Sequence, residues 1–172
     1  MKTNKKTRQY AGLIAAVLAY YLIHEGAHLV TALCMGVFKT INVVGVMGVQ
    51  IDVCNEMMSD TQMGVFCLMG PLATLVSGWL LVALAGRIGR LNSSLLRAVL
   101  YYITIIMLLL DPLYMSVICS MVGGGDMNGI ALLMPETAAR IAAGILLVVN
   151  GLLFWKRVLP VYTASFKEQG EN

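Results

Sequence analysis

The chain has 172 residues, of which 59% are hydrophobic and 12% charged, and its formal net charge is +3. Globular domains average about 25% charged residues, so a soluble domain of this length could not bury so much apolar surface. The composition argues against a soluble globular protein and predicts an all-α integral membrane protein in which residues 1–172 form one domain.

Four apolar segments are long enough to cross a bilayer, since a membrane-spanning helix needs about 20 residues. The first follows a basic start, but it is too long for a secretory signal peptide and has no clean small-residue cleavage site, so we expect it to be retained. The segments therefore predict about four transmembrane helices. They cover about residues 10–38, 63–85, 95–122 and 138–155.

The stretch after the first span, residues 40–53, is rich in β-branched residues and glycine. This composition favours strands over a helix, so we predict a small membrane-associated β-hairpin there, with an ordinary loop as the alternative. The edge of such a hairpin could bind an extended substrate by strand addition.

Helix-breaking residues interrupt the second and third spans. Gly70-Pro71 lies inside the second span and Asp111-Pro112 inside the third, and a proline there frees a carbonyl and bends the helix axis. We interpret Gly70-Pro71 as a close-packing element rather than a substrate contact. Three glycines, residues 123–125, end the third span and permit an unwound backbone. A lone Asn150 in the fourth span predicts a hydrogen bond between helices.

Ten of the twelve Lys and Arg residues lie before the first span, between the second and third, or after the fourth. The positive-inside rule predicts that these regions, and hence both termini, are cytoplasmic in a multi-pass protein of the cell membrane. The basic clusters indicate topology and contact with lipid headgroups, and we expect no nucleic-acid partner.

An ionisable cluster, His24-Glu25-Gly26-Ala27-His28, lies in the first apolar span. A charged side chain at membrane depth costs about 2.5–3.5 kcal/mol on insertion scales, and a bound metal ion would offset that cost. Residues four apart share one face of a helix, so His24 and His28 can bind one ion together. Glu25 beside them is the candidate general base that takes a proton from water. The pattern predicts one Zn²⁺ per chain.

A catalytic zinc site usually has three protein ligands, and the chain contains no histidine besides His24 and His28. The third ligand must then be a carboxylate or a thiolate. We favour Asp126, because the preceding glycines allow its side chain to turn inward, although a helix cap is the alternative role. Asp111 is the second candidate, since at about 1.5 Å per residue it lies at nearly the depth of His24. Its alternative role is a proline-linked kink in which the carboxylate bonds to a nearby hydroxyl or water. The weaker thiolate candidates are Cys34, Cys67 and Cys119.

Three segments together resemble the site-2 protease family of intramembrane zinc metalloproteases. They are His24-Glu25-Gly26-Ala27-His28, Gly70-Pro71 and Gly125-Asp126-Met127-Asn128-Gly129, and they span about residues 10–135. The resemblance implies a short, domain-poor member in which His24, His28 and Asp126 hold zinc and Glu25 is the catalytic base. The chain departs from the family pattern where methionine, not glycine, follows Asp126. It also lacks the asparagine-proline pair that usually precedes the aspartate segment. Its charge bias predicts that the first helix runs from the cytoplasm outward, whereas in family members this helix commonly runs toward the cytoplasm.

We therefore predict a zinc-dependent metalloendopeptidase that hydrolyses peptide bonds of membrane-embedded or membrane-proximal substrates. The expected partners are a membrane protein or peptide substrate and the lipid bilayer. A non-catalytic metal-binding membrane protein, such as a maturation factor, is the alternative, and the intact Glu25 argues against it. A metal transporter has less support, because the second and fourth spans are nearly without polar residues.

Overall fold

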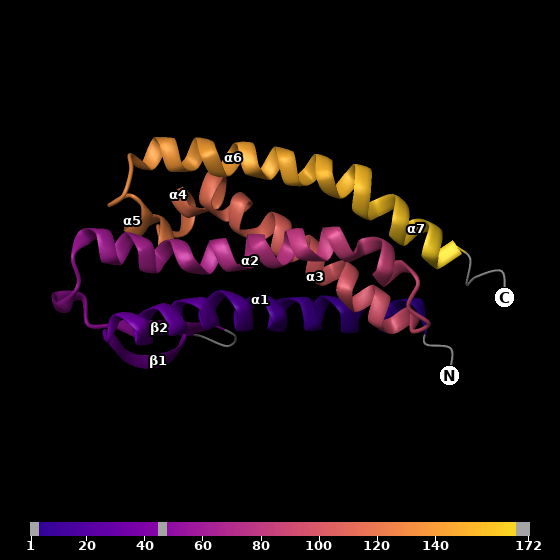
Figure 1. Ribbon diagram of the computed structural model, residues 1–172, viewed down its shortest axis with the longest axis horizontal. Coiled ribbons are helices and arrows are strands. Elements are labelled where there is room, and N and C mark those ends of the chain that lie inside the picture. Colours follow the sequence, from indigo (N-terminus) through magenta and orange to yellow (C-terminus); the bar gives the residue numbers. More distant parts are fainter. Residues whose placement is uncertain (1–3, 45–47, 168–172) are drawn as a thin grey trace.

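The computed structural model describes residues 4–44 and 48–167, which form a bundle of long helices with one small hairpin (Figure 1). In chain order the elements are α1 (Lys5–Met35), β1 (Phe38–Val44), β2 (Gly48–Val53), a 3-10 turn (Asn55–Met57), α2 (Asp60–Gly89), α3 (Ser94–Leu113), a π-helical turn (Tyr114–Ile118), α4 (Cys119–Val122), α5 (Asp126–Ile130), α6 (Glu136–Leu153), a second π-helical turn (Phe154–Val158) and α7 (Leu159–Lys167).

Four helical segments are long and apolar enough to cross a membrane, which confirms the predicted all-α, four-span fold. The second and fourth segments are longer than predicted, because their helices continue through polar residues that hydropathy alone treats as ends. Ser59 begins α2 with a reciprocal capping box to Gln62, which satisfies two backbone donors of the first turn. The segments cover Lys6–Met35, Asp60–Gly89, Ser94–Val122 and Glu136–Phe166.

The first helix ends at Met35, before the predicted boundary at residue 38. Gly36 adopts a left-handed conformation with φ 69° and ψ 22°. Its N–H donates to the Leu33 carbonyl at 3.1 Å, and the Val37 N–H donates to the Ala32 carbonyl at 3.0 Å. These two bonds close the helix in a Schellman motif, for which glycine carries no Cβ penalty. The chain then turns directly into β1.

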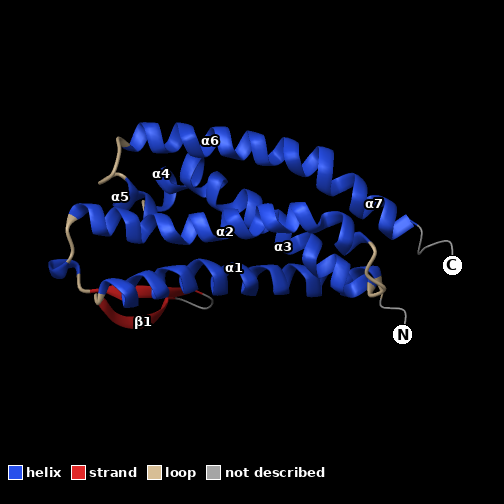
Figure 2. Ribbon diagram, viewed as in Figure 1, coloured by secondary structure: helices blue, strands red, loops and turns tan. Residues whose placement is uncertain are grey.

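The predicted hairpin is present, and its two strands pair in antiparallel register from Phe38 opposite Val53 to Val44 opposite Gly48. It begins two residues earlier than predicted, and residues 45–47, which fall within the predicted hairpin, lie outside the described residues. The hairpin lies beside the C-terminal half of α1 (Figure 2). Ile51 of β2 is buried and packs in the apolar cluster that joins α1, α2 and α5.

The bundle interior is apolar, with a few polar side chains that bond across helices. Asn150 of α6 is fully buried; it accepts a hydrogen bond from Trp79 Nε1 at 3.0 Å and donates one to the Leu108 carbonyl at 2.9 Å. These bonds tie α6 to α2 and α3 and confirm the predicted interhelical role of Asn150. The start of α1 and the end of α7 lie at one end of the bundle, whereas the hairpin and α5 lie at the other (Figure 1).

Candidate metal centre

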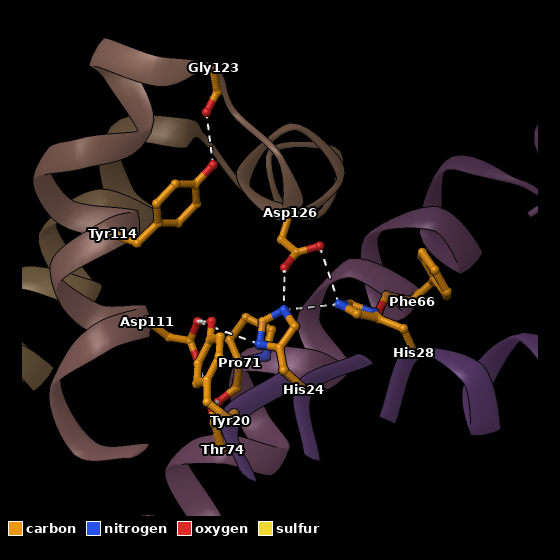
Figure 3. A network of polar contacts seen from close by, with 10 residues as sticks. All are labelled: Tyr20, His24, His28, Phe66, Pro71, Thr74, Asp111, Tyr114, Gly123 and Asp126. Carbon is orange, nitrogen blue, oxygen red and sulfur yellow. Dashed lines mark hydrogen bonds and ion pairs between the residues drawn. The ribbon is translucent and has the colours of Figure 1, made fainter. Parts of the chain in front are cut away.

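His24 and His28 lie one turn apart on the inner face of α1, as their spacing predicts. Their side chains are only 8% and 4% exposed, and their Nε2 atoms lie 3.3 Å apart. Figure 3 shows both imidazole rings directed toward the start of α5. The two nitrogens therefore converge on one point rather than facing lipid.

Asp126 approaches the same point from the first residue of α5. Its Oδ2 lies 3.0 Å from His24 Nε2, and its Oδ1 lies 3.4 Å from His28 Nε2 (Figure 3). The loop before it depends on glycine, because Gly123 and Gly125 have φ of 102° and 41°, which side-chain-bearing residues rarely adopt. The structure thus brings together the three residues that the sequence predicts as ligands.

The spacing of the donor groups is close to that around a small tetrahedral ion. Zinc bonds of about 2.0–2.1 Å in tetrahedral geometry separate the ligand atoms by about 3.3–3.4 Å. The two Nε2 atoms lie 3.3 Å apart, Asp126 Oδ2 lies 3.0 Å from His24 Nε2, and the other carboxylate oxygen, Oδ1, lies 3.4 Å from His28 Nε2. Two imidazoles and one carboxylate also form a donor set that zinc prefers. Burial raises the pKa of the Asp126 carboxyl, but hydrogen bonds from protonated His24 and His28 outweigh it and lower this pKa to about 2. A bound cation would take the place of those shared protons beside the same carboxylate.

Asp111, the second candidate for the third ligand, lies on the other side of His24. Its Oδ1 is 3.5 Å from His24 Nδ1, while Nε2 of the same ring faces Asp126. The Tyr20 hydroxyl donates to Asp111 Oδ1 at 2.6 Å, and the Thr74 hydroxyl donates to Oδ2. Asp111 is thus placed to orient His24 from the nitrogen that would not bind metal, which is the usual second carboxylate of a histidine–zinc site.

The ring orientation of His28 is set by a backbone group. His28 Nδ1 lies 2.9 Å from the Phe66 carbonyl oxygen in α2. A carbonyl can only accept, so Nδ1 carries the proton and the Nε2 lone pair is left for a metal ion. His28 therefore has one ring nitrogen fixed by a hydrogen bond and the other open, whereas His24 Nδ1 lies 3.5 Å from the Asp111 carboxylate without a hydrogen bond of standard geometry.

Gly70 leaves the space that the two imidazoles occupy. A Cβ at this position would overlap His28 Nε2 and lie 2.7 Å from His24 Nε2. The sequence predicts only close helix packing for Gly70-Pro71, and the structure shows that the close neighbours are the two candidate ligands. Reasoning from sequence assigned Thr74 only to close helix packing and missed Tyr20. Tyr20 precedes His24 by one helical turn and so shares its face, which is the signal that could have found it.

The thiolate candidates are not part of this donor group, although Cys67 lines the same cleft. Within the described residues, the cluster of donor atoms able to hold one ion consists of His24, His28 and Asp126 and includes no cysteine. Cys34 is exposed, and Cys119 bonds the Met115 carbonyl. Cys67 is buried against Gly129, where an added Cβ would overlap its sulfur.

Glu25 lines a cleft of about 770 Å³ that also contains the three donor side chains. It is half-buried and lies against the backbone of Ile51. All six residues of β2, from Gly48 to Val53, line the same cleft. A carboxylate, a three-donor centre and a strand edge thus share one opening at the hairpin end of the bundle.

Comparisons with protein-family models, with curated proteins and with solved structures find no match to this chain. The resemblance to site-2 proteases accordingly stays a prediction from the motifs, and the functional argument depends on the geometry of the cleft.

Proposed function

We propose that this chain is an intramembrane zinc metalloprotease that hydrolyses peptide bonds within or beside the bilayer. The observation that carries the proposal is the convergence of His24 Nε2, His28 Nε2 and the Asp126 carboxylate, whose Oδ2 lies 3.0 Å from His24 Nε2 and whose Oδ1 lies 3.4 Å from His28 Nε2. Three protein ligands leave one position for water, which is the arrangement of catalytic rather than structural zinc.

The donor set and the space beside Gly70 fit a Zn²⁺ ion, which when bound would act as a Lewis acid and bring the pKa of a coordinated water toward about 7. Glu25 lines the cleft next to the ligands and acts as the general base: it takes the proton from the attacking water and delivers it to the leaving amine. Asp111 keeps His24 oriented through Nδ1, and the Phe66 carbonyl does the same for His28.

The substrate in this proposal is a membrane peptide in extended form. A helical substrate hides its backbone groups in its own hydrogen bonds, so the segment to be cut must unwind. Within the described residues β2 pairs only with β1, and its whole length lines the cleft. An unwound segment can pair with the free edge of β2 by strand addition, which supports peptides over small molecules as substrates.

The proposed location is the cell membrane, with both termini cytoplasmic. The support is the charge bias, since cations gather before α1, between α2 and α3, and after α6. In this orientation the cleft opens toward the extracytoplasmic side, because the hairpin lies at the opposite end of the bundle from the termini (Figure 1).

The test uses the full chain purified in detergent with zinc, and single-span membrane peptides as probes. Glu25→Gln should retain stoichiometric zinc while cleavage falls by about 10²–10⁴-fold, the usual contribution of a general acid–base group. The matched control is Glu136→Gln, because Glu136 is exposed and pairs only with Arg140 one helical turn away. Wild-type protein that binds no zinc would overturn the metal assignment. Wild-type protein that binds zinc but leaves every peptide intact would favour the non-catalytic alternative.

A further inference from the structure

A second cavity lies at the opposite end of the bundle, where the chain begins and ends (Figure 1). Its volume is about 610 Å³, and it lies between the first turns of α1, the first turns of α3 and the end of α7. None of its lining residues belongs to the metal centre. The residues that carry the argument are Arg8, Tyr101, Tyr162, Thr163 and Phe166.

The cavity is rich in groups that bind anions. The guanidinium of Arg8 lies 5.9 Å from the centre of the Phe166 ring, and that of Arg97 lies 5.5 Å from the same ring. Two positive charges therefore lie around the Phe166 ring, and one of them, Arg8, lines the cavity. Arg8 is in no ion pair with a carboxylate of the described residues.

The charge of the bundle is strongly polarised along its length. Within the described residues, every Asp and Glu lies in the hairpin half or in the middle of the bundle, and the remaining two acidic residues, Glu168 and Glu171, follow the described part. The cations at the cavity end come from the ends of α1, α2, α3 and the second π-helical turn. Those with described side chains are Lys6, Arg8, Arg87, Arg90, Arg97, Lys156 and Arg157.

Tyr162 lines this cavity and carries a buried hydroxyl. The residue is 1% exposed, and its hydroxyl has no hydrogen bond of standard geometry in the described part of the chain. This hydroxyl interacts with the neighbouring Thr104, whose own hydroxyl donates to the Leu100 carbonyl at 2.7 Å. A buried hydroxyl usually has a well-aligned partner, which an acceptor bound in the cavity would provide.

From these observations we propose that the cavity binds the phosphate group of an anionic phospholipid. Arg8 supplies the charge, and the Tyr162 and Thr163 hydroxyls are the hydrogen-bond donors. The cavity lies at the ends of three membrane-spanning segments, which is the depth of the headgroups. Basic pockets between transmembrane helices on the cytoplasmic side are typical sites for anionic headgroups, and tyrosines are enriched at this level of the bilayer. The proposal is independent of any protease activity.

The test places the full chain in phosphatidylcholine nanodiscs with and without phosphatidylglycerol and counts retained lipid by native mass spectrometry. We expect one phosphatidylglycerol retained per chain, and an affinity about tenfold lower for Arg8→Gln, since hydrogen bonds to a charged group are among the stronger ones. The matched control is Arg157→Gln, because Arg157 is exposed at the same end but does not line the cavity. Its retention should equal that of the wild type.

Further arms separate the alternatives. Tyr162→Phe keeps the ring but removes the hydroxyl, so it should also weaken retention, and it serves as the deciding variant if Arg8→Gln unfolds in phosphatidylcholine alone. Millimolar inorganic phosphate that displaces the lipid would support a phosphate site also open to free phosphate. Equal retention of phosphatidylcholine, or equal losses in Arg8→Gln and Arg157→Gln, would overturn the proposal in favour of general surface electrostatics.

Discussion

The carboxylate of Asp111 lies 3.5 Å from Nδ1 of His24, on the opposite side of the imidazole from the nitrogen that faces Asp126. One histidine is thus held between two carboxylates that come from different parts of the chain, one in α3 and one in α5. The two carboxylates have different surroundings: Asp111 accepts hydroxyl hydrogen bonds from Tyr20 and Thr74, whereas Asp126 lies in the cleft. In the proposed metal centre, this arrangement gives Asp111 the orienting role and Asp126 the ligating role.

The two aspartates should therefore respond differently to the same substitution. Asp111→Asn should weaken zinc binding by about 10–100-fold, the usual effect of losing a partner behind a ligand, while one zinc still binds at saturation. Asp126→Asn should abolish stoichiometric binding. Chelator competition measures both, with the exposed Asp60→Asn as the control. Equal losses in the two variants would contradict the assignment.

Gly70 should be essential for the metal centre although it bonds to nothing in it. Gly70→Ala places a methyl group against both imidazoles, and overpacking of this kind costs about 1–3 kcal/mol. We expect lower zinc affinity and a lower free energy of unfolding. Gly86 in the same helix has no atom within 4 Å of an added Cβ, so Gly86→Ala should leave zinc binding unchanged and stabilise the helix by about 0.5–1 kcal/mol. Wild-type zinc affinity in Gly70→Ala would refute the packing argument.

Tyr114 should act on the metal centre by holding the loop before Asp126. Its hydroxyl donates to the Gly123 carbonyl at 2.8 Å (Figure 3). A Cβ on Gly125 would lie 2.8 Å from the Tyr114 hydroxyl oxygen. Tyr114→Phe removes one hydrogen bond, worth about 0.5–1.5 kcal/mol, and should lower zinc affinity by a few-fold to tenfold. The rate of zinc release distinguishes this effect from a general loss of stability. Tyr10→Phe, at a site 67% exposed, is the control and should change neither quantity.

Zinc should stabilise the folded chain, because its candidate ligands come from α1 and α5 and converge only after folding. At a free zinc concentration 100 times the Kd, the free energy of unfolding should rise by about 2.7 kcal/mol, and a chelator should reverse the gain. His28→Ala should remove this dependence on zinc. Stabilisation of the same size in His28→Ala would show that zinc acts elsewhere on the chain.

Much of the fold follows from local patterns. The four apolar segments, the β-branched stretch and the buried Asn150 were all predictable, because hydropathy, strand propensity and the cost of an unpaired polar group act within a few residues. The boundaries were less predictable. Helices α2 and α6 continue past the most apolar part of each span. Gly36 ends α1 through a Schellman motif, which a hydropathy profile does not reveal.

The sequence by itself determined that His24 and His28 share a helix face and that Glu25 lies beside them, since the helical period settles both. It left Asp111 and Asp126 as competing third ligands, because depth along a span does not specify which ring nitrogen a side chain reaches. Only the tertiary structure decided how they divide around His24: the packing of α3 against α1 places Asp111 near Nδ1, and the left-handed glycines before α5 turn Asp126 toward Nε2. The same packing brought Gly70 and Thr74 to the site through contacts between segments far apart in the chain, and it placed Asp111 beside Tyr20, which shares the helix face of His24.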